Sequence, residues 1–250
     1  MLAPITLSDN CYLISSTLVS DKLNLQSFNT RPTCQPDNRV GRTLNNLTSA
    51  GRGQVSRVTI GSEQGVLRHY YRGGLMANLS DDKFLWTGIN RTRAVSEYRL
   101  LEWMTTKDLP VPFPLGARVI RNGLYYTCDL ITREVPDTRT LAQKLQLDEI
   151  DLSHWRAVGK AIRQLHMHNV FHADLNANNI LLNDVGTVTI IDFDKCRQRK
   201  GYSWKQMNIN RLKRSLDKLT AGKIVKYFNA HSWQALLEAC LLYTSPSPRD

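Results

Sequence analysis

The stretch "HADLNANN" at residues 172–179, followed shortly by "IDFD", constrains the fold more than any other part of the chain. It places Asp174, Asn179 and, further on, Asp192 among strongly apolar neighbours. The apolar runs "NILL" and "TVTII" stand on either side of a turn at residues 184–186. Short apolar runs around such a turn predict two buried strands. We therefore expect a hairpin that carries Asp192 back beside the loop that holds Asp174 and Asn179.

The spacing H-x-D-x-x-x-x-N, with a hairpin and a further aspartate behind it, is typical of phosphoryl transfer. One aspartate orients the attacking hydroxyl and accepts its proton, while an asparagine and a second aspartate supply the oxygen ligands that Mg²⁺ prefers. H-x-D-x-x-x-x-N alone is a weak signal that could occur in any loop. The hairpin and the position of Asp192 make the kinase interpretation specific.

These residues resemble the catalytic loop and the metal-binding motif of the protein-kinase-like superfamily. The resemblance implies that Asp174 is the catalytic base and that Asn179 and Asp192 bind Mg²⁺. It also implies a structural role for His172, which packs the loop. ATP is then the expected phosphoryl donor and Mg²⁺ the expected metal.

Candidate partners for the nucleotide lie upstream in the expected order. Gly51 and Gly53 lie in a Gly-rich turn between two predicted strands and could cover the ATP phosphates with their backbone N–H groups, although such a pair alone is more often an ordinary turn. Glu97 lies on a predicted helix, where the family keeps an acid that pairs with a strand lysine. The lysine itself is missing, and Arg68 stands in its place, with Arg72 as the competing candidate. Arginine keeps its charge but is not equivalent to lysine at such a site.

The segments "VLRHYYRGGLMANLSDDKFLWTG", "TRAVSEYRLLEWM", "LPVPFPLGARV" and "VFHADLNANNILLN" together resemble the 3-deoxy-D-manno-octulosonic acid (Kdo) kinase family of lipopolysaccharide core kinases. D-F-G reads Asp192-Phe193-Asp194 here, and no activation segment follows it. The resemblance implies ATP-dependent phosphorylation of the 4-hydroxyl of a Kdo residue on a lipid A precursor. It also implies a peripheral protein on the cytoplasmic face of the inner membrane. Rival acceptors within the enzyme class are a heptose, an aminoglycoside or a protein serine.

The order of predicted elements indicates an α+β fold of two lobes, because strands dominate the first half and helices the second. We expect a small antiparallel-sheet lobe at 1–134, a mostly helical lobe at 135–240 and a disordered or artefactual tail at 241–250. Strands are predicted in the second part of 49–60, after its Gly-rich turn, at 65–74 and at 123–132, with two more around the turn near 185. The predicted helices lie at 93–105, at 140–147 and from an N-cap at Ser153 to about His168, and the basic segment is expected to be largely helical.

The chain carries a net charge of +11, and its positive charge is concentrated in one segment. Lys195–Lys226 contains eleven Lys and Arg residues and one acid, Asp217. This composition indicates an anionic partner, and a membrane surface carrying the Kdo–lipid A acceptor fits it. A nucleic-acid-binding module is the rival outside the enzyme class, but it would leave the two aspartates of the motif unexplained. A membrane scaffold with an inactive kinase fold is a further alternative. The five cysteines lack the spacing of a disulfide framework or a zinc site, and no signal peptide or spanning helix is expected.

Overall fold

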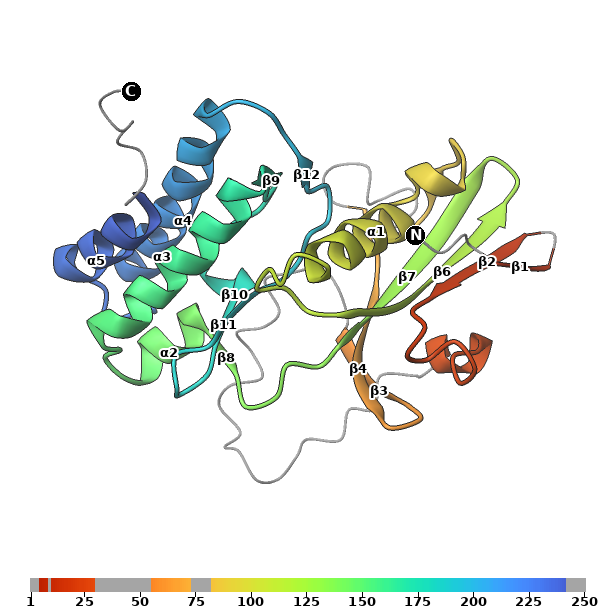
Figure 1. The fold of residues 1–250 in the computed structure, drawn as a ribbon, viewed down its shortest axis with the longest axis horizontal. Helices are drawn as coiled ribbons and strands as arrows, with labels where there is room; N and C mark the ends of the chain where they lie inside the picture. Colours follow the sequence, from red (N-terminus) through yellow and green to blue (C-terminus); the bar gives the residue numbers. More distant parts are fainter. Residues whose placement is uncertain (1–4, 9, 30–54, 73–81, 242–250) are drawn as a thin grey trace, which may run out of the picture. The chain divides into compact units, whose positions relative to one another are not determined.

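The protein is described here by a computed structural model, which covers residues 5–8, 10–29, 55–72 and 82–241. The chain forms two compact units, Met1–Glu102 with Phe113–Glu134, and Trp103–Pro112 with Val135–Asp250. The first unit is built on a sheet and the second is mostly helical, which confirms the expected α+β class (Figure 1).

The described strands of the first unit form one antiparallel sheet in the order β1-β2-β6-β7-β4-β3, with β5 also paired to β7. The strands are β1 (Ile5–Ser8), β2 (Cys11–Ser15), β3 (Val55–Ile60), β4 (Glu63–His69), β5 (Phe84–Leu85), β6 (Pro114–Asn122) and β7 (Tyr125–Arg133). The tight turns of the β3–β4 and β6–β7 hairpins contain Gly61 and Gly123, whose φ angles of 61° and 59° are easily reached only without a Cβ. β6 is missing from the sequence-based prediction, while β3, β4 and β7 were expected.

One face of this sheet packs on a compact apolar cluster. The cluster consists of Leu13, Val19, Leu23, Phe28, Val58, Ile60, Leu67, Leu115 and Ile131. Phe28 belongs to the short 3₁₀ helix η1 (Leu25–Phe28), which Asn24 caps by accepting hydrogen bonds from two backbone N–H groups. Burial of these side chains anchors β4, and so fixes the strand that carries Arg68.

Helix α1 (Arg93–Thr105) follows the 3₁₀ turn η4 (Ile89–Arg91) and forms where helical spacing predicted it. The expected apolar stripe is confirmed, since its residues are fully buried: Ala94, Tyr98, Leu101 and Met104. The helix begins against the sheet, because the backbone N–H of Arg93 donates to the hydroxyl of Tyr126 on β7 at 3.1 Å. Glu97 is therefore held one turn into a helix that is attached to the sheet.

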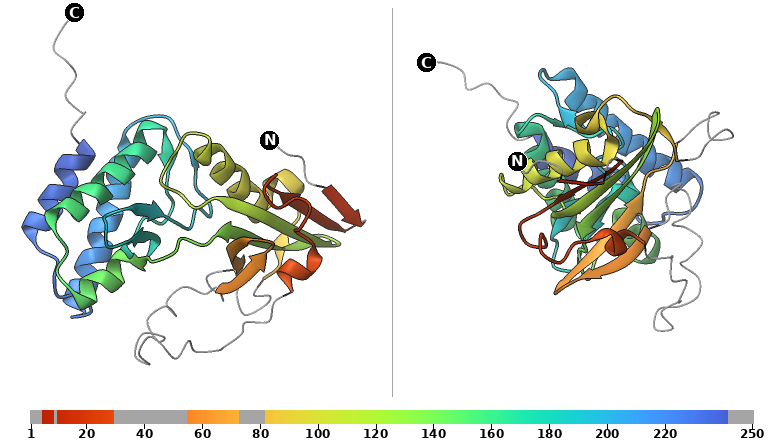
Figure 2. Two further views of the ribbon diagram at one scale, coloured as in Figure 1. Left: turned by 60° about the horizontal axis from the view of Figure 1, so that its bottom comes forward. Right: turned by 90° about the vertical axis from the view of Figure 1, so that its right-hand side faces the viewer.

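The second unit contains α2 (Leu141–Leu147), α3 (Leu152–Met167), α4 (Ser203–Ala221) and α5 (Ala230–Leu241). Helices α3 and α5 lie side by side in each view (Figures 1 and 2). The predicted stripe of α3 is confirmed as core: Trp155, Val158, Ile162 and Leu165 are all buried.

The predicted N-cap of α3 was wrong. Helix α3 begins at Leu152 with Asp151 as its N-cap, and Ser153 is already helical. The carbonyl of Asp151 accepts hydrogen bonds from the N–H groups of His154 and Trp155, which closes the first turn before Ser153 could cap it.

Short strands frame the loop of the motif. They are β8 (Arg139–Thr140), β9 (Val170–Phe171), β10 (Ile180–Leu182), β11 (Val188–Ile190) and β12 (Arg197–Gln198), with the 3₁₀ turn η5 (Ala177–Asn179) just before β10. The predicted hairpin is confirmed, since β10 and β11 pair antiparallel with Ile180 opposite Ile190. The basic segment is helical only from Ser203, because its first part pairs as β12 with β9.

Candidate active site

His172 links the two parts of the motif through its ring. Its Nδ1 accepts a hydrogen bond from the backbone N–H of Asp174 at 3.2 Å, so its Nε2 carries the proton and donates to the carbonyl of Ile191 at 3.0 Å. Burial lowers the pKa of His172, which keeps the ring neutral. The histidine therefore connects the loop of Asp174 to Ile191, the residue before Asp192. This is the structural role that the resemblance implies for His172.

Two further groups hold His172 in place. The side chain of Asn208 on α4 donates to the carbonyl of His172 at 2.6 Å and accepts from its N–H at 3.3 Å. The ring of Phe193 meets the imidazole edge-on, with the ring centroids 4.8 Å apart. Asn208 and Phe193 are both buried. The loop is therefore held by α4 through Asn208, and by the Asp192–Asp194 turn through Phe193.

Asn179 lies between the catalytic loop and the hairpin. Its side-chain Nδ2 donates to the backbone carbonyl of Asp174 at 2.9 Å. Its backbone carbonyl accepts a hydrogen bond from the backbone N–H of Ile191 at 3.0 Å. No described residue donates to its Oδ1, so this oxygen remains for a ligand. Asp192, the residue after Ile191, has a φ of 65°, a left-handed conformation that aspartate adopts more readily than most residues. The three residues of the motif are thus brought together by one loop and one hairpin.

The carboxylate of Asp174 has a cationic partner that no sequence motif pointed to. Arg211 on α4 contacts Oδ1 of Asp174 through both Nε, at 2.7 Å, and Nη2, at 2.6 Å. Both side chains are about half exposed, at 47% for Arg211 and 50% for Asp174. No described residue donates to Oδ2 of Asp174. One oxygen is therefore engaged in an ion pair, and the other is open to an incoming hydroxyl.

In the first unit, Arg68 on β4 forms an ion pair with Glu97 on α1. The hydroxyl of Tyr70 joins them, accepting from Arg68 at 2.9 Å and donating to Glu97 at 2.6 Å. Glu97 is almost completely buried, so its charge depends on these partners. Arg72, the competing candidate, instead lies over the ring of Phe84 at 5.9 Å. The pairing with Glu97 identifies Arg68 as the cation in the position of the strand lysine.

Gly51 and Gly53, the expected phosphate-covering pair, lie outside the described residues. Sequence reasoning also missed Tyr70, Asn208 and Arg211. Arg211 could have been suspected only as one of many cations in the basic segment, because nothing in its local sequence marks it as a partner of Asp174.

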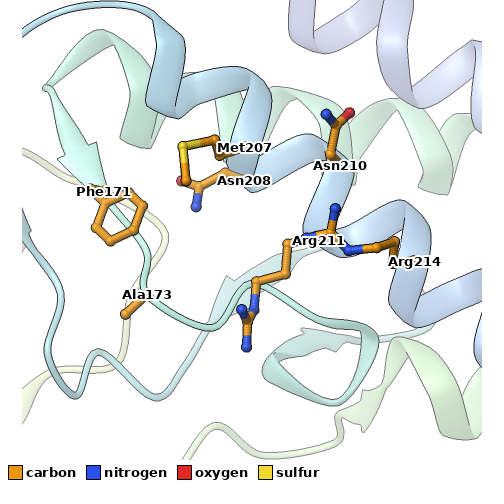
Figure 3. A pocket seen from close by; sticks show the side chains of 7 residues that line it. All are labelled: Phe171, Ala173, Met207, Asn208, Asn210, Arg211 and Arg214. Carbon is orange, nitrogen blue, oxygen red and sulfur yellow. The ribbon is translucent and has the colours of Figure 1, made fainter.

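A pocket of about 200 Å³ opens between α4 and the segment Phe171–Ala173, just before Asp174 in the chain (Figure 3). It is lined by Phe171, Ala173, Met207, Asn208, Asn210, Arg211 and Arg214. It therefore combines two guanidinium groups with three apolar side chains. Its lining includes Ala173 and Arg211, the chain neighbour and the ion-pair partner of the residue expected to act as base.

The described residues contain no group of three or more His, Cys, Asp and Glu side chains that could hold a metal ion. The expected magnesium ligands are instead one amide and one carboxylate, from Asn179 and Asp192. This set suits Mg²⁺, which binds few protein groups and keeps waters and phosphate oxygens in its shell. It would not suit a structural zinc ion, which takes four protein ligands.

A buried histidine that fixes an H-x-D-x-x-x-x-N loop, a hairpin that returns an aspartate, and an Arg–Glu pair between strand and helix define the class of kinase-like phosphotransferases. A model of the lipopolysaccharide kinase (Kdo/WaaP) family matches residues 41–239. The chain belongs to this family, and it is an enzyme that transfers a phosphoryl group to a sugar hydroxyl. The kinase-like fold expected from the sequence is thereby confirmed.

Several curated relatives carry the name 3-deoxy-D-manno-octulosonic acid kinase. The protein of Vibrio cholerae serotype O1 is 43% identical over 74% of this chain and 79% of its own length. That of Photobacterium profundum is 40% identical over 69% of this chain and 72% of its own length. That of Actinobacillus succinogenes is 38% identical over 76% and 82%. Within the described residues, no helix is both long and apolar enough to cross a membrane.

Proposed function

We propose that this protein is an ATP-dependent kinase that phosphorylates the 4-hydroxyl of a Kdo residue on a lipid A precursor. The observation that carries the proposal is the state of Asp174, which has one oxygen held by Arg211 and the other open beside a pocket. The names of the curated relatives support the choice of a Kdo acceptor.

Asp174 is the general base of the proposed reaction. Its Oδ2 accepts the proton of the acceptor hydroxyl as the hydroxyl oxygen attacks the γ-phosphorus of ATP. A bond forms between that oxygen and phosphorus, the bond from phosphorus to the β–γ bridging oxygen breaks, and ADP leaves with the electron pair. The bonds from Arg211 to Oδ1, and from Asn179 to the backbone carbonyl of Asp174, keep the carboxylate in position during this step.

Asn179 and Asp192 are the proposed ligands of Mg²⁺, which when bound would neutralise charge on the phosphates of the donor. The backbone bond from Ile191 to Asn179 keeps the two residues adjacent on the hairpin. In the first unit, Arg68 is the proposed cation for the donor phosphates, oriented by Glu97 and Tyr70. Gly51 and Gly53 remain the proposed backbone cover for these phosphates.

The test measures phosphate transfer from labelled ATP with Mg²⁺ to Kdo–lipid A, with lipid A lacking Kdo as the control acceptor. We expect label in the Kdo-bearing acceptor alone, and a loss of about 10²–10⁴-fold in turnover for Asp174→Asn with ATP binding retained. The matched control is Asp217→Asn, which removes an exposed carboxylate that pairs with Lys213 on α4. Near-normal turnover of Asp174→Asn would overturn the assignment of the base. Transfer to a heptose or to a protein serine, but not to Kdo, would overturn the acceptor.

We also propose that Lys195–Lys226 docks the enzyme on an anionic membrane surface, as a peripheral protein on the cytoplasmic face of the inner membrane. None of the eleven Lys and Arg residues of this segment is buried. Tyr202, which lies in the same segment, is 81% exposed and could enter the headgroup layer. Each cation near such a surface contributes about 1 kcal/mol, so a few of them give reversible binding.

Sedimentation with vesicles tests this docking. We expect binding to vesicles that contain anionic lipid, weaker binding at high salt, and little binding to neutral vesicles. Neutralising Lys200 and Lys218, both exposed, should weaken the binding, whereas neutralising Lys107, an exposed cation outside the segment, should not. Equal binding to neutral and anionic vesicles would contradict the proposal.

A further inference from the structure

The pocket beside Asp174 has a specific chemistry. Phe171 and Met207 lie on one side of it, and Arg211 and Arg214 project from α4 (Figure 3). Arginines three residues apart on a helix share one face, so the two guanidinium groups serve the same space. Apolar side chains beside two arginines suit a ligand with a hydrophobic ring face and an oxyanion.

The two arginines differ in their partners within the described part of the chain. Arg211 uses its Nε and Nη2 groups on Oδ1 of Asp174, and its Nη1 donates to no described residue. Arg214 is exposed and forms no ion pair with the part of the chain that the structure describes. A guanidinium group has five N–H donors, so Arg211 can hold Asp174 and a second oxyanion at the same time.

We propose that this pocket recognises the carboxylate of the acidic sugar acceptor, with Arg214 as the main binding residue and Arg211 as the bridge between that carboxylate and Asp174. The proposal rests on the kinase function proposed above and assigns the residues that select its acceptor. Phe171 and Met207 cover the apolar face of the sugar. Because Arg211 contacts both groups, the carboxylate is bound close to the oxygen that receives the hydroxyl proton. A carboxylate on the phosphorylated sugar itself meets this condition more directly than a phosphate at the far side of the lipid.

Because Arg211 is also paired with Asp174, binding of the acceptor carboxylate should affect the position of the base. Both side chains are half exposed, so solvent screens the two charges and the ion pair is weak. A bound carboxylate would fix the guanidinium group of Arg211, and with it the carboxylate of Asp174. Arg211 is then a positioning residue, whose loss affects turnover, while Arg214 affects acceptor binding.

The test compares Kdo–lipid A with the same acceptor after its sugar carboxylate has been converted to the carboxamide. For the natural protein, we expect kcat/KM to fall about tenfold or more on this change. In Arg214→Gln, KM for the carboxylate acceptor should rise about tenfold with kcat within about twofold, and the preference for carboxylate should be lost. The matched control is Lys160→Gln, which removes an exposed cation on α3, outside both the pocket lining and the basic segment Lys195–Lys226.

Arg211→Gln should lower kcat with both acceptors, and Arg211→Lys should restore part of it, because a single ammonium can still contact Asp174. A purely structural role for Arg211 would not produce this separation between kcat and KM. A third acceptor, which keeps the sugar carboxylate but lacks the lipid phosphates, separates the two possible oxyanions.

The outcomes are distinguishable. No transfer to any Kdo acceptor by the natural protein would overturn the proposed function and the carboxylate site with it. Transfer without preference between carboxylate and carboxamide would overturn the site alone and leave the function standing. An Arg214→Gln defect that depends on the lipid phosphates, or that Lys160→Gln reproduces, would also overturn the carboxylate assignment. The comparison of acceptors with the natural protein decides the matter even if a variant fails to fold.

Discussion

The side chain of Asn208 hydrogen-bonds to both the N–H and the carbonyl of His172, 36 residues earlier in the chain. Both residues are buried, so neither backbone group of His172 could turn to water instead. Helix α4 therefore sets the position of the histidine that orders the loop of Asp174. A change at Asn208 should therefore affect the reaction through the position of this loop.

We expect Asn208→Ala to destabilise the second unit by about 1–3 kcal/mol, because it leaves two buried backbone groups unpaired. Turnover should fall as well, since His172 loses its support. Urea unfolding and kcat with the Kdo acceptor measure the two effects. Gln206→Ala is the control, since Gln206 is exposed on the same helix and its side chain donates a hydrogen bond to Asn210. Unchanged stability and turnover in Asn208→Ala would show that α4 does not support the loop.

Much of the catalytic loop could be predicted from sequence because its structure is local. His172, Asp174 and Asn179 lie within a few residues of each other, and the apolar runs after them form a hairpin with little choice of register. The order of these parts then placed Asp192 beside them. The helix of Glu97 was equally accessible, since its apolar spacing alone defines the buried face.

Features that depend on tertiary packing could not be predicted in this way. Arg211 meets Asp174 across 37 residues of sequence, and only the packing of α4 on the loop selects it from the other cations of its segment. Strand β6 begins in a proline-rich stretch and contains Gly116, features that argue against a strand. In the fold, Gly116 is needed for close packing, because an added Cβ would lie 2.3 Å from Cδ2 of Leu23.

The N-terminus of α3 shows a smaller limit of prediction from sequence. Asp151 and Ser153 are both favoured N-cap residues, and they stand two positions apart. Intrinsic preference does not separate them. The choice is made by the backbone, which is extended at Asp151 and helical from Leu152 onward.

Gly159 allows the close approach of α3 and α5. An added Cβ would lie 2.3 Å from the carbonyl oxygen of Leu236 and 3.0 Å from the Cβ of Ala239. We expect Gly159→Ala to be destabilising by about 1–3 kcal/mol despite the better helix propensity of alanine, because a backbone atom cannot move aside cheaply. Urea unfolding measures the effect. Ser153→Ala, exposed on the same helix, should change the stability little, and a Gly159→Ala protein as stable as the natural one would contradict the observed packing.

His69 should make the stability of the first unit depend on pH. Its Nδ1 lies 2.6 Å from Oδ1 of Asp129, whose Oδ2 is paired with Arg118 at 2.8 Å, and Asp82 lies 3.5 Å from Nε2. The hydrogen bond to Asp129, helped by the charges of Asp129 and Asp82 and opposed by partial burial, raises the pKa of His69. The folded protein thus binds this proton more tightly than the unfolded chain, whose histidine pKa is about 6.5.

The contribution of His69 is therefore complete below a pH of about 6.5 and is lost as the pH rises through the folded-state pKa. Replacement by glutamine removes the charge but keeps a donor. We expect His69→Gln to be less stable than the natural protein at pH 6, with the difference shrinking by pH 9, as measured by urea unfolding at each pH. A difference that stays the same at both values would show that protonation of His69 does not stabilise the fold.

The Arg68–Glu97 pair provides a test of both stability and the nucleotide assignment. Glu97 is only 3% exposed in its side chain, so Arg68→Ala removes the cationic partner of a buried carboxylate, which keeps its hydrogen bond from Tyr70. Removing one member of a buried pair costs about 3–5 kcal/mol. The double variant Arg68→Ala/Glu97→Ala should be less destabilised than the sum of the single variants, with a coupling of about 1–3 kcal/mol, because it no longer buries a carboxylate that has lost its arginine. Unfolding of the four proteins measures this cycle, and ATP titration measures the binding.

Arg72→Ala is the matched control for this cycle, since it removes the competing arginine, whose guanidinium lies over Phe84 instead of beside Glu97. It should show no coupling to Glu97 and should leave ATP binding close to normal, whereas Arg68→Ala should weaken it. The reverse result, with loss of ATP binding in Arg72→Ala and none in Arg68→Ala, would move the phosphate contact to Arg72. Arg68 would then be only the structural partner of a buried acid, and the ion pair would no longer support a role in the reaction.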